Sequence, residues 1–260
     1  DSNQKKFNIK LPRGVLLHGP PGCGKTMLVR NISDYLNVPV FQIHPSDFSS
    51  SGYGDSEAKL LKLFDSAKSL SPCIFFMDEI DSLCPKRDSN QSASSQRITT
   101  LLLTLMDGCS NSNQTAKIFF IGATNMPSSL ETALRRPGRF DREIEISPPS
   151  SADRFSILKI MLEHYPNAVT ETDLRVISDC THGYVGSDLS LLCKESFINA
   201  LKDKKEPVTV EFNHIRAAFS KIKPSAMREV FIEVPRIKWS DIGGQSVTKQ
   251  KLIECVEWPI

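Results

Sequence analysis

Apolar positions in the first part of the chain fall into short runs that alternate with longer amphipathic stretches. Several runs are apolar throughout, as is expected for strands of a parallel sheet that is covered on both faces. The runs that predict strands are Gly14–His18, Val40–His44, Cys73–Met77, Ile118–Ala123 and Arg142–Ile146. The stretches that predict helices between them are Thr26–Asn37, Glu57–Ser69, Gln96–Asp107 and Ser129–Leu134. This alternation predicts an α/β fold, with a parallel five-stranded sheet flanked by helices.

The pattern changes at the proline-containing segment 147–151, which predicts a domain boundary. Helical stretches follow, and acidic residues near three expected starts (Asp153, Asp173 and Asp188) suit the helix dipole. The expected helices are Ala152–His164, Thr172–His182, Ser187–Lys202 and Glu211–Ser220. We therefore expect an α/β domain over residues 1–147 and a small all-helical domain over residues 148–223.

Residues 224–260 fit neither domain, because Pro224 and Pro235 interrupt them and Trp239-Ser-Asp-Ile-Gly-Gly begins a new pattern. One interpretation is a linker followed by the start of another module. The alternative is a C-terminal arm that packs on its own domain. The first residue is Asp1 rather than Met, so we expect a piece of a longer polypeptide.

Composition excludes few functions, but it limits the binding partners and the compartment that we expect. The 260 residues carry a formal net charge of only +2, so bulk charge gives no argument for nucleic-acid or membrane binding. The seven cysteines include no C-x-x-C pair, which argues against a disulfide framework or a zinc site and for a reducing compartment. No apolar run approaches the roughly 18 residues of a membrane span.

The most informative motif is Gly19-Pro20-Pro21-Gly22-Cys23-Gly24-Lys25-Thr26, which has the G-x-x-x-x-G-K-[ST] spacing of a phosphate-binding loop. Its glycines allow backbone N–H groups to turn toward an anion. Lys25 supplies charge for the β- and γ-phosphates, and Thr26 supplies a hydroxyl for Mg²⁺. The motif lies between an expected strand and an expected helix, where a helix N-terminus favours anions.

Polar residues at the ends of two further strands fit the same chemistry. Asp78 would hold Mg²⁺ through its hydration shell, and Glu79 would polarise a water for attack on the γ-phosphate. Asn125 would orient that water or contact the γ-phosphate. The arginine-rich loop 135–142 suits a phosphate clamp, and the alternative is a solvated basic loop.

Together, segments 19–26, 76–80, 122–125 and 135–141 resemble an AAA ATPase module, and Thr181–Leu189 resembles the lid segment that closes its nucleotide pocket. The likeness is to the branch that holds valosin-containing protein, and most of all to the Drg/Afg-type ATPases of ribosome maturation. Segment 224–244 is similar to the linker from the first module of a tandem ATPase to its second.

The resemblance implies a homo-hexameric ring that binds ATP and Mg²⁺ between subunits and moves a substrate through its pore. It makes Asp78 and Thr26 metal ligands, Glu79 the catalytic acid and Asn125 a sensor. It assigns nucleotide contacts to Gly19, Pro20, Pro21, Gly22, Cys23, Gly24, Lys25, Thr26, Met27, Ile157, Gly186 and Ser187. Arg136 and Arg139 become the fingers for the next subunit, with Arg139 ranked first because Gly138 frees its backbone.

Two positions depart from the family pattern. Met161 stands where this branch often has a histidine that contacts the ribose. Tyr53 is displaced by one residue from the usual place of the pore-loop aromatic, so it is either a pore residue or a turn aromatic resting on its own domain.

The function expected from these observations is ATP hydrolysis coupled to remodelling of a protein complex or a ribonucleoprotein particle, in the cytoplasm or the nucleus. One alternative is a nucleotide-gated assembly scaffold with little turnover. A nucleic-acid motor is a third, which the near-neutral charge disfavours, so we expect no direct nucleic-acid binding.

Overall fold

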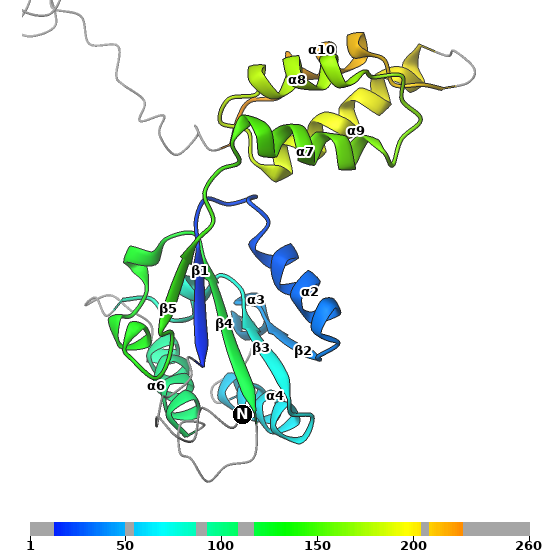
Figure 1. Cartoon of the computed structure of the whole chain (residues 1–260). Helices are drawn as coiled ribbons and strands as arrows, with labels where there is room; N and C mark the ends of the chain where they lie inside the picture. Colours follow the sequence, from blue (N-terminus) through cyan, green and yellow to red (C-terminus); the bar gives the residue numbers. More distant parts are fainter. Residues whose placement is uncertain (1–12, 50–54, 87–92, 109–116, 204–207, 226–260) are drawn as a thin grey trace, which may run out of the picture. The chain divides into compact units, whose positions relative to one another are not determined.

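The computed structural model describes residues 13–49, 55–86, 93–108, 117–203 and 208–225. Its sheet has five strands in the order β2-β3-β4-β1-β5, and every neighbouring pair is parallel (Figure 1). The strands are β1 Gly14–His18, β2 Val40–Ile43, β3 Cys73–Met77, β4 Ile118–Thr124 and β5 Arg142–Glu145. The predicted α/β fold with a five-stranded parallel sheet is confirmed.

Three helices of this part lie where the sequence predicts them, and two short ones were not predicted. The predicted helices are α2 Lys25–Leu36, α4 Asp55–Ser69 and α6 Ala93–Gly108, and the additional ones are α3 Ser46–Ser49 and α5 Ile80–Leu83. Tyr53 and the tail 226–260 lie outside the described residues.

The helix predicted over Ser129–Leu134 is wrong. Two 3₁₀ turns, η1 Pro127–Ser129 and η2 Thr132–Arg135, flank an extended Leu130. The backbone of this segment bonds to a distant segment instead: Lys86 N–H donates to the Ser129 carbonyl at 2.7 Å, and Glu131 N–H donates to the Cys84 carbonyl at 3.1 Å. A helix over these residues would use the Ser129 carbonyl for its own i→i−4 ladder, and the extended backbone of Leu130 is incompatible with that ladder.

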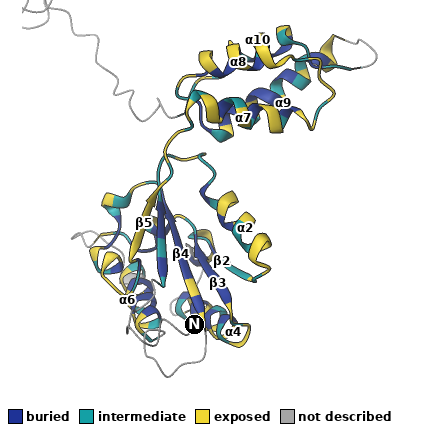
Figure 2. Cartoon of the chain, viewed as in Figure 1, coloured by how far each residue is buried: buried dark blue, intermediate teal, exposed yellow. Residues whose placement is uncertain are grey.

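The central strands β1, β3 and β4 are buried on both faces of the sheet, and their successive side chains point to opposite faces. On one face, Leu16, Phe75 and Phe120 belong to a large apolar cluster that includes side chains of α4 and α6. On the other face, their neighbours in sequence, Leu17, Phe76 and Ile121, belong to a smaller cluster that includes Val29 of α2. Figure 2 shows the central strands as mostly buried. The apolar runs of the sequence are therefore explained by burial on both sides.

The later helices are α7 Ser151–Leu162, α8 Glu171–Cys180, α9 Gly186–Lys202 and α10 Phe212–Phe219, and they share an apolar cluster of their own. Capping boxes stabilise the N-termini of α7 and α8. Asp153 accepts from Ser150 N–H at 3.0 Å, and Asp173 accepts from Thr170 N–H at 3.0 Å. Each of these carboxylates also has a lowered pKa, because it accepts hydrogen bonds from the capping residue. The predicted boundaries 147/148 and 223/224 remain predictions.

None of the described helices is long and apolar enough to cross a membrane.

Removing one ring from the larger cluster should cost much of the stability. Phe120 is 1% exposed, and its ring centroid lies 5.8 Å from that of Phe75 and 6.4 Å from that of Phe64. We expect Phe120→Ala to lower the free energy of unfolding by about 3–5 kcal/mol, measured by chemical denaturation. The control is Phe119→Ala, because Phe119 is 36% exposed and should cost about 1 kcal/mol or less. Equal losses in the two variants would contradict this assignment of the core.

Candidate functional site

The carboxyl ends of three neighbouring strands meet at one edge of the sheet. In the parallel register, His18 at the end of β1 is paired with Thr124 at the end of β4, and Met77 at the end of β3 is paired with Gly122. The phosphate-loop motif follows β1, Asp78 and Glu79 follow β3, and Asn125 follows β4. The fold therefore brings together groups that lie up to a hundred residues apart.

The backbone of the loop takes a shape that its glycines allow. Gly22 and Gly24 have φ values of +78° and +92°, in the region that side chains with a Cβ rarely adopt. A Cβ on Gly22 would also come within 2.2 Å of the Ser187 hydroxyl. The loop then enters α2 at Lys25, so the first N–H groups of this helix face the loop. This glycine-built turn at a helix start fits a phosphate group.

Lys25 is 8% exposed, and its ammonium is held inside the loop. Its Nζ donates to the carbonyls of Gly19 at 2.7 Å and Pro20 at 2.9 Å, and to Asn125 Oδ1 at 2.7 Å. A buried ammonium is costly unless it is hydrogen-bonded, so these bonds explain how the loop tolerates the charge. The third bond also ties the end of β4 to the loop after β1.

Thr26 and Asp78 form the second connection across the site. The Thr26 hydroxyl donates to Asp78 Oδ2 at 2.7 Å, and Asp78 Oδ1 accepts from the Glu79 N–H at 3.1 Å. Hydroxyl and carboxylate oxygens are the ligands that Mg²⁺ prefers, and Mg²⁺ commonly takes its other ligands from water and phosphate. The described residues contain no cluster of three or more His, Cys, Asp or Glu that could hold a metal by itself. The donor set therefore fits a Mg²⁺–phosphate complex.

Glu79 has an unusual backbone for a residue with a side chain, with φ 47° and ψ 47°. Such left-handed conformations are uncommon outside glycine and tend to occur at functional sites. The residue is exposed, and its carboxylate has no hydrogen bond within the part of the chain that the structure describes. It is the acidic group of the site that is available to bind a water.

Two residues that the sequence analysis left without a role support this edge. The Thr124 hydroxyl donates to Asp81 Oδ1 at 2.7 Å and accepts from the Met126 N–H at 3.0 Å. Thr124 is 1% exposed. The turn after β3 is thereby fixed to the end of β4. No sequence signal shows this pair, because its members lie 43 residues apart.

The arginines of the 135–142 loop differ in their surroundings. The Arg139 guanidinium makes two bonds to the Asp107 carboxylate, at 2.9 and 2.8 Å, and another to the Ala133 carbonyl. Arg135 pairs with Glu143 at 2.6 and 2.8 Å. Arg136 is exposed, and its guanidinium makes no hydrogen bond or ion pair to any described residue. Of the two predicted fingers, Arg139 is bonded within its own chain, and Arg136 is the one whose guanidinium is unbonded among the described residues.

Of the predicted lid residues, Ser187 lies against the phosphate loop. Its N–H donates to the Gly22 carbonyl at 3.1 Å, and Gly186 opens α9 beside it. Ile157 of α7 packs against the apolar cluster of the later helices, together with Met161. Met27, in the first turn of α2, is 64% exposed.

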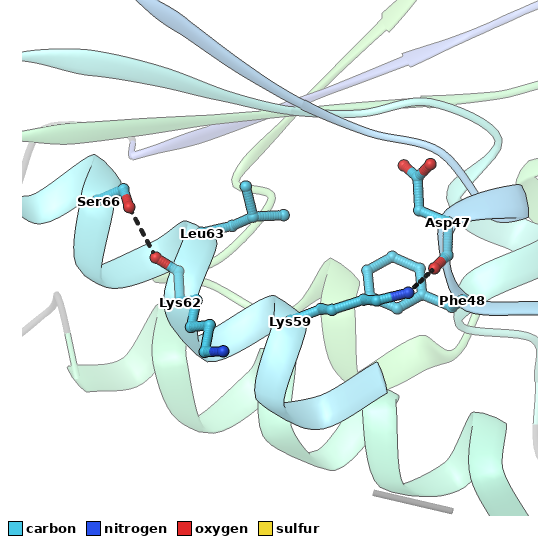
Figure 3. Close-up of a pocket in the computed structure, with 6 residues that line it drawn as sticks. All are labelled: Asp47, Phe48, Lys59, Lys62, Leu63 and Ser66. Carbon is cyan, nitrogen blue, oxygen red and sulfur yellow. Dashed lines mark hydrogen bonds between the residues drawn. The ribbon is translucent and has the colours of Figure 1, made fainter. Parts of the chain in front are cut away.

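A pocket of about 320 Å³ lies elsewhere, between α3 and α4 (Figure 3). Its lining residues are Asp47, Phe48, Lys59, Lys62, Leu63 and Ser66. None of the predicted site residues contributes to it, so the candidate site is defined by the loop chemistry and not by this pocket.

A parallel sheet with this strand order, a phosphate loop after β1 and acidic residues after β3 define the class of phosphate-loop nucleotide-binding proteins. Residues 15–148 match the model of the ATPase family associated with various cellular activities, AAA, and residues 171–217 match the AAA+ lid domain. The chain belongs to the AAA ATPase family, and the predicted resemblance is confirmed. The family binds nucleotide.

Curated relatives match nearly the whole chain. It is 44% identical to the ATPase family gene 2 protein homolog A of Homo sapiens, over 98% of this chain and 30% of the relative. It is 42% identical to the ATPase family gene 2 protein of Schizosaccharomyces pombe, over 98% and 32%. It is 41% identical to the cell division cycle protein 48 homolog of Archaeoglobus fulgidus, over 98% and 36%. The chain thus spans about a third of the length of these relatives.

We predict that the Arg139–Asp107 ion pair holds the arginine loop 135–142 in place. The hydrogen bond from Arg139 lowers the pKa of Asp107, so the pair should persist at neutral pH and break only as the pH falls below the usual aspartate range. We expect Asp107→Asn to speed solvent exchange of the Arg139 Nε–H at neutral pH, as measured by NMR.

The matched control is Glu143→Gln, which should release Arg135 and leave the Arg139 signal unchanged. An Arg139 Nε–H that exchanges at the same rate in wild type and Asp107→Asn would show that the ion pair does not hold the loop.

Proposed function

We propose that this chain binds ATP with Mg²⁺ at the 19–26 loop and hydrolyses it, as one module of a tandem AAA ATPase that works as a hexameric ring. The bonds of Lys25 to the loop carbonyls and to Asn125 are the observation that carries the proposal. Together with the Thr26–Asp78 bond, they assemble charge, metal ligands and a strand-end amide within one edge of the sheet. The family and its relatives support the same activity.

In the proposed mechanism, the loop N–H groups and Lys25 bind the phosphates. Thr26 and Asp78 would hold Mg²⁺, which when bound supplies positive charge to the phosphate oxygens. Glu79 accepts a proton from the attacking water or orients that water, since its carboxylate is exposed and unbonded among the described residues. Asn125 fixes the position of the Lys25 ammonium and orients the same water.

The hexameric ring is proposed from the family and from Arg136. A guanidinium that reaches the γ-phosphate of an adjoining subunit stabilises the charge that develops in the transition state. The Arg136 side chain is exposed and its guanidinium has no partner among the described residues, whereas the Arg139 guanidinium is bonded within its own subunit. We therefore assign the contact across subunits to Arg136 and the ordering of the loop to Arg139.

The substrate we propose is a protein complex or a ribonucleoprotein particle, including particles of ribosome maturation. Support comes from the resemblance to the ATPase family gene 2 proteins, whose names specify an ATPase family and no substrate. The compartment, cytoplasm or nucleus, stays a prediction from the sequence.

The alternative is a nucleotide-gated scaffold that turns over little, and the comparison of two variants decides between it and hydrolysis. Glu79→Gln keeps the size of the side chain but removes the base, so ATP should bind with nearly the wild-type Kd while turnover falls by about 10²-fold or more. Lys25→Ala should lose ATP affinity itself, because the ammonium bonded inside the loop is removed. Calorimetry measures binding and single-turnover phosphate release measures hydrolysis.

A wild-type chain that binds ATP yet releases phosphate no faster than Glu79→Gln would favour the scaffold. A Lys25→Ala chain with an unchanged Kd would remove the loop from the proposal altogether.

The arginine assignment has its own test in assembled rings. We expect Arg136→Ala to bind ATP normally and to lose turnover by roughly 10³-fold or more. Mixing Arg136→Ala with Lys25→Ala protein should restore part of the turnover, because some interfaces then combine an intact loop with an intact arginine. Arg142→Ala is a matched control, since Arg142 is an exposed arginine of β5 that is not one of the two predicted fingers. If Arg136→Ala lowered the turnover of isolated subunits as much as it lowers the turnover of assembled rings, Arg136 would act within its own chain.

A further inference from the structure

The start of α9 contacts the phosphate loop on one side. Ser187 N–H donates to the Gly22 carbonyl at 3.1 Å. A Cβ placed on Gly22 would come within 2.9 Å of Val185 Cγ2, so Val185 and Ser187 pack directly against the loop. A shift of the loop backbone at Gly22 would therefore displace Val185 and Ser187, which contact it.

Asp188, the next residue of α9, faces a different segment. It is 5% exposed, and its Oδ2 accepts from the Val185 N–H at 3.2 Å and from the Ser225 N–H at 2.8 Å. Its Oδ1 accepts from the Ser225 hydroxyl at 2.6 Å. A buried carboxylate is stable only when it is well hydrogen-bonded, and Ser225 supplies two of these three bonds. Asp188 thus joins the start of α9 to the segment by which the chain leaves the helical domain.

A second attachment lies close by in the sequence. Tyr184 is 2% exposed, and its hydroxyl donates to the Ile222 carbonyl at 2.5 Å. Its ring stacks on Phe219 at a centroid distance of 5.7 Å. The exit segment, defined here as Ile222–Ser225, is therefore held at both ends by residues on either side of Ser187.

We propose that Tyr184 and Asp188 form a clamp that couples the phosphate loop to the exit segment, so that nucleotide bound at the loop tightens the hold on Ile222–Ser225. This inference rests on the proposed function, because it needs nucleotide at the loop. Tyr184 and Asp188 are positioning residues, since they act through Ser187 and Gly22.

Nucleotide should strengthen the clamp and not weaken it, because phosphate orders the groups that connect the loop to Asp188. Phosphate bound to the loop N–H groups fixes the backbone around Gly22, and the Gly22–Ser187 bond then fixes the start of α9. The Val185–Asp188 bond lies within that same turn, so the carboxylate is held where both groups of Ser225 can reach it. Linkage is reciprocal: releasing the exit segment must weaken nucleotide binding by the same factor by which nucleotide strengthens the clamp.

The test uses the full 260-residue chain and two variants outside the proposed nucleotide site. Ser225→Ala removes the hydroxyl bonded to Asp188, and Tyr184→Phe removes the hydroxyl bonded to Ile222 while keeping the ring. Ser225→Thr retains a hydroxyl and is the rescue variant. Ser220→Ala is the matched control, because the Ser220 hydroxyl bonds to the Ala217 carbonyl in its own helix. Calorimetry with ADP and Mg²⁺ gives Kd, and hydrogen exchange reports on the exit segment.

We expect ADP to slow exchange of the Ser225 amide in wild type, and Ser225→Ala and Tyr184→Phe each to raise Kd on the order of 5-fold or more. Ser225→Thr and Ser220→Ala should keep the wild-type Kd. A merely structural clamp would lower the melting temperature without changing Kd or the effect of ADP on exchange, and that result would overturn the proposal. So would a lower Kd in either variant. A wild-type chain that binds no ADP would instead contradict the proposed function.

Discussion

The site depends on the in-register parallel pairing of β3, β4 and β1. This pairing aligns the carboxyl ends of the three strands. Asp78, Glu79 and Asn125 follow these ends within one or two positions. Because side chains alternate between faces, a slip of β3 by one residue would turn its buried side chains to the opposite face and displace Asp78 and Glu79, which follow its end. The slip is opposed by the apolar clusters, since Phe75 and Phe76 are buried on opposite faces. The chemistry at the strand ends is therefore held in place by packing in the middle of the strands.

The buried ammonium of Lys25 places a second demand on the fold. A charge that is 8% exposed needs hydrogen-bond acceptors, and the loop supplies two of its own carbonyls. Those carbonyls can point inward because the glycines of the loop permit its turn, and Asn125 adds an acceptor from the neighbouring strand. None of the described hydrogen bonds is donated by an N–H of residues 19–24, so these groups can donate to an anion. The bonds that satisfy Lys25 and the N–H groups proposed to bind phosphate thus belong to one loop conformation.

Sequence reasoning recovered the features that local pattern determines. All five strands were predicted, and burial on both faces explains why β1, β3 and β4 are largely apolar, whereas the four residues of β5 are exposed. The glycine spacing located the loop. It missed what depends on distant partners. The helix expected at Ser129–Leu134 is displaced by pairing with residues 84–86. Asp81 and Asp188 each look like ordinary surface acids in the sequence, and only the fold brings them to Thr124 and Ser225.

The arginine loop shows why local chemistry alone could not rank its members. Gly138 does take a positive φ, as its sequence suggested, but the turn that it forms directs Arg139 toward Asp107. Phe140 is 1% exposed and its N–H donates to the Leu134 carbonyl, so both ends of the turn are anchored in the core. An anchored turn loses little conformational entropy when a neighbour approaches it.

Arg136 lies within this rigid turn and is exposed to water, where an unpaired guanidinium carries no desolvation cost. A residue meant for another subunit must have no strong partner in its own, because that bond would have to break before the contact forms. Arg139 does have such a partner, and its bonds keep the turn in shape. In the proposed ring, the bonds that hold Arg139 within its subunit would thus present Arg136 to a neighbour in a fixed position.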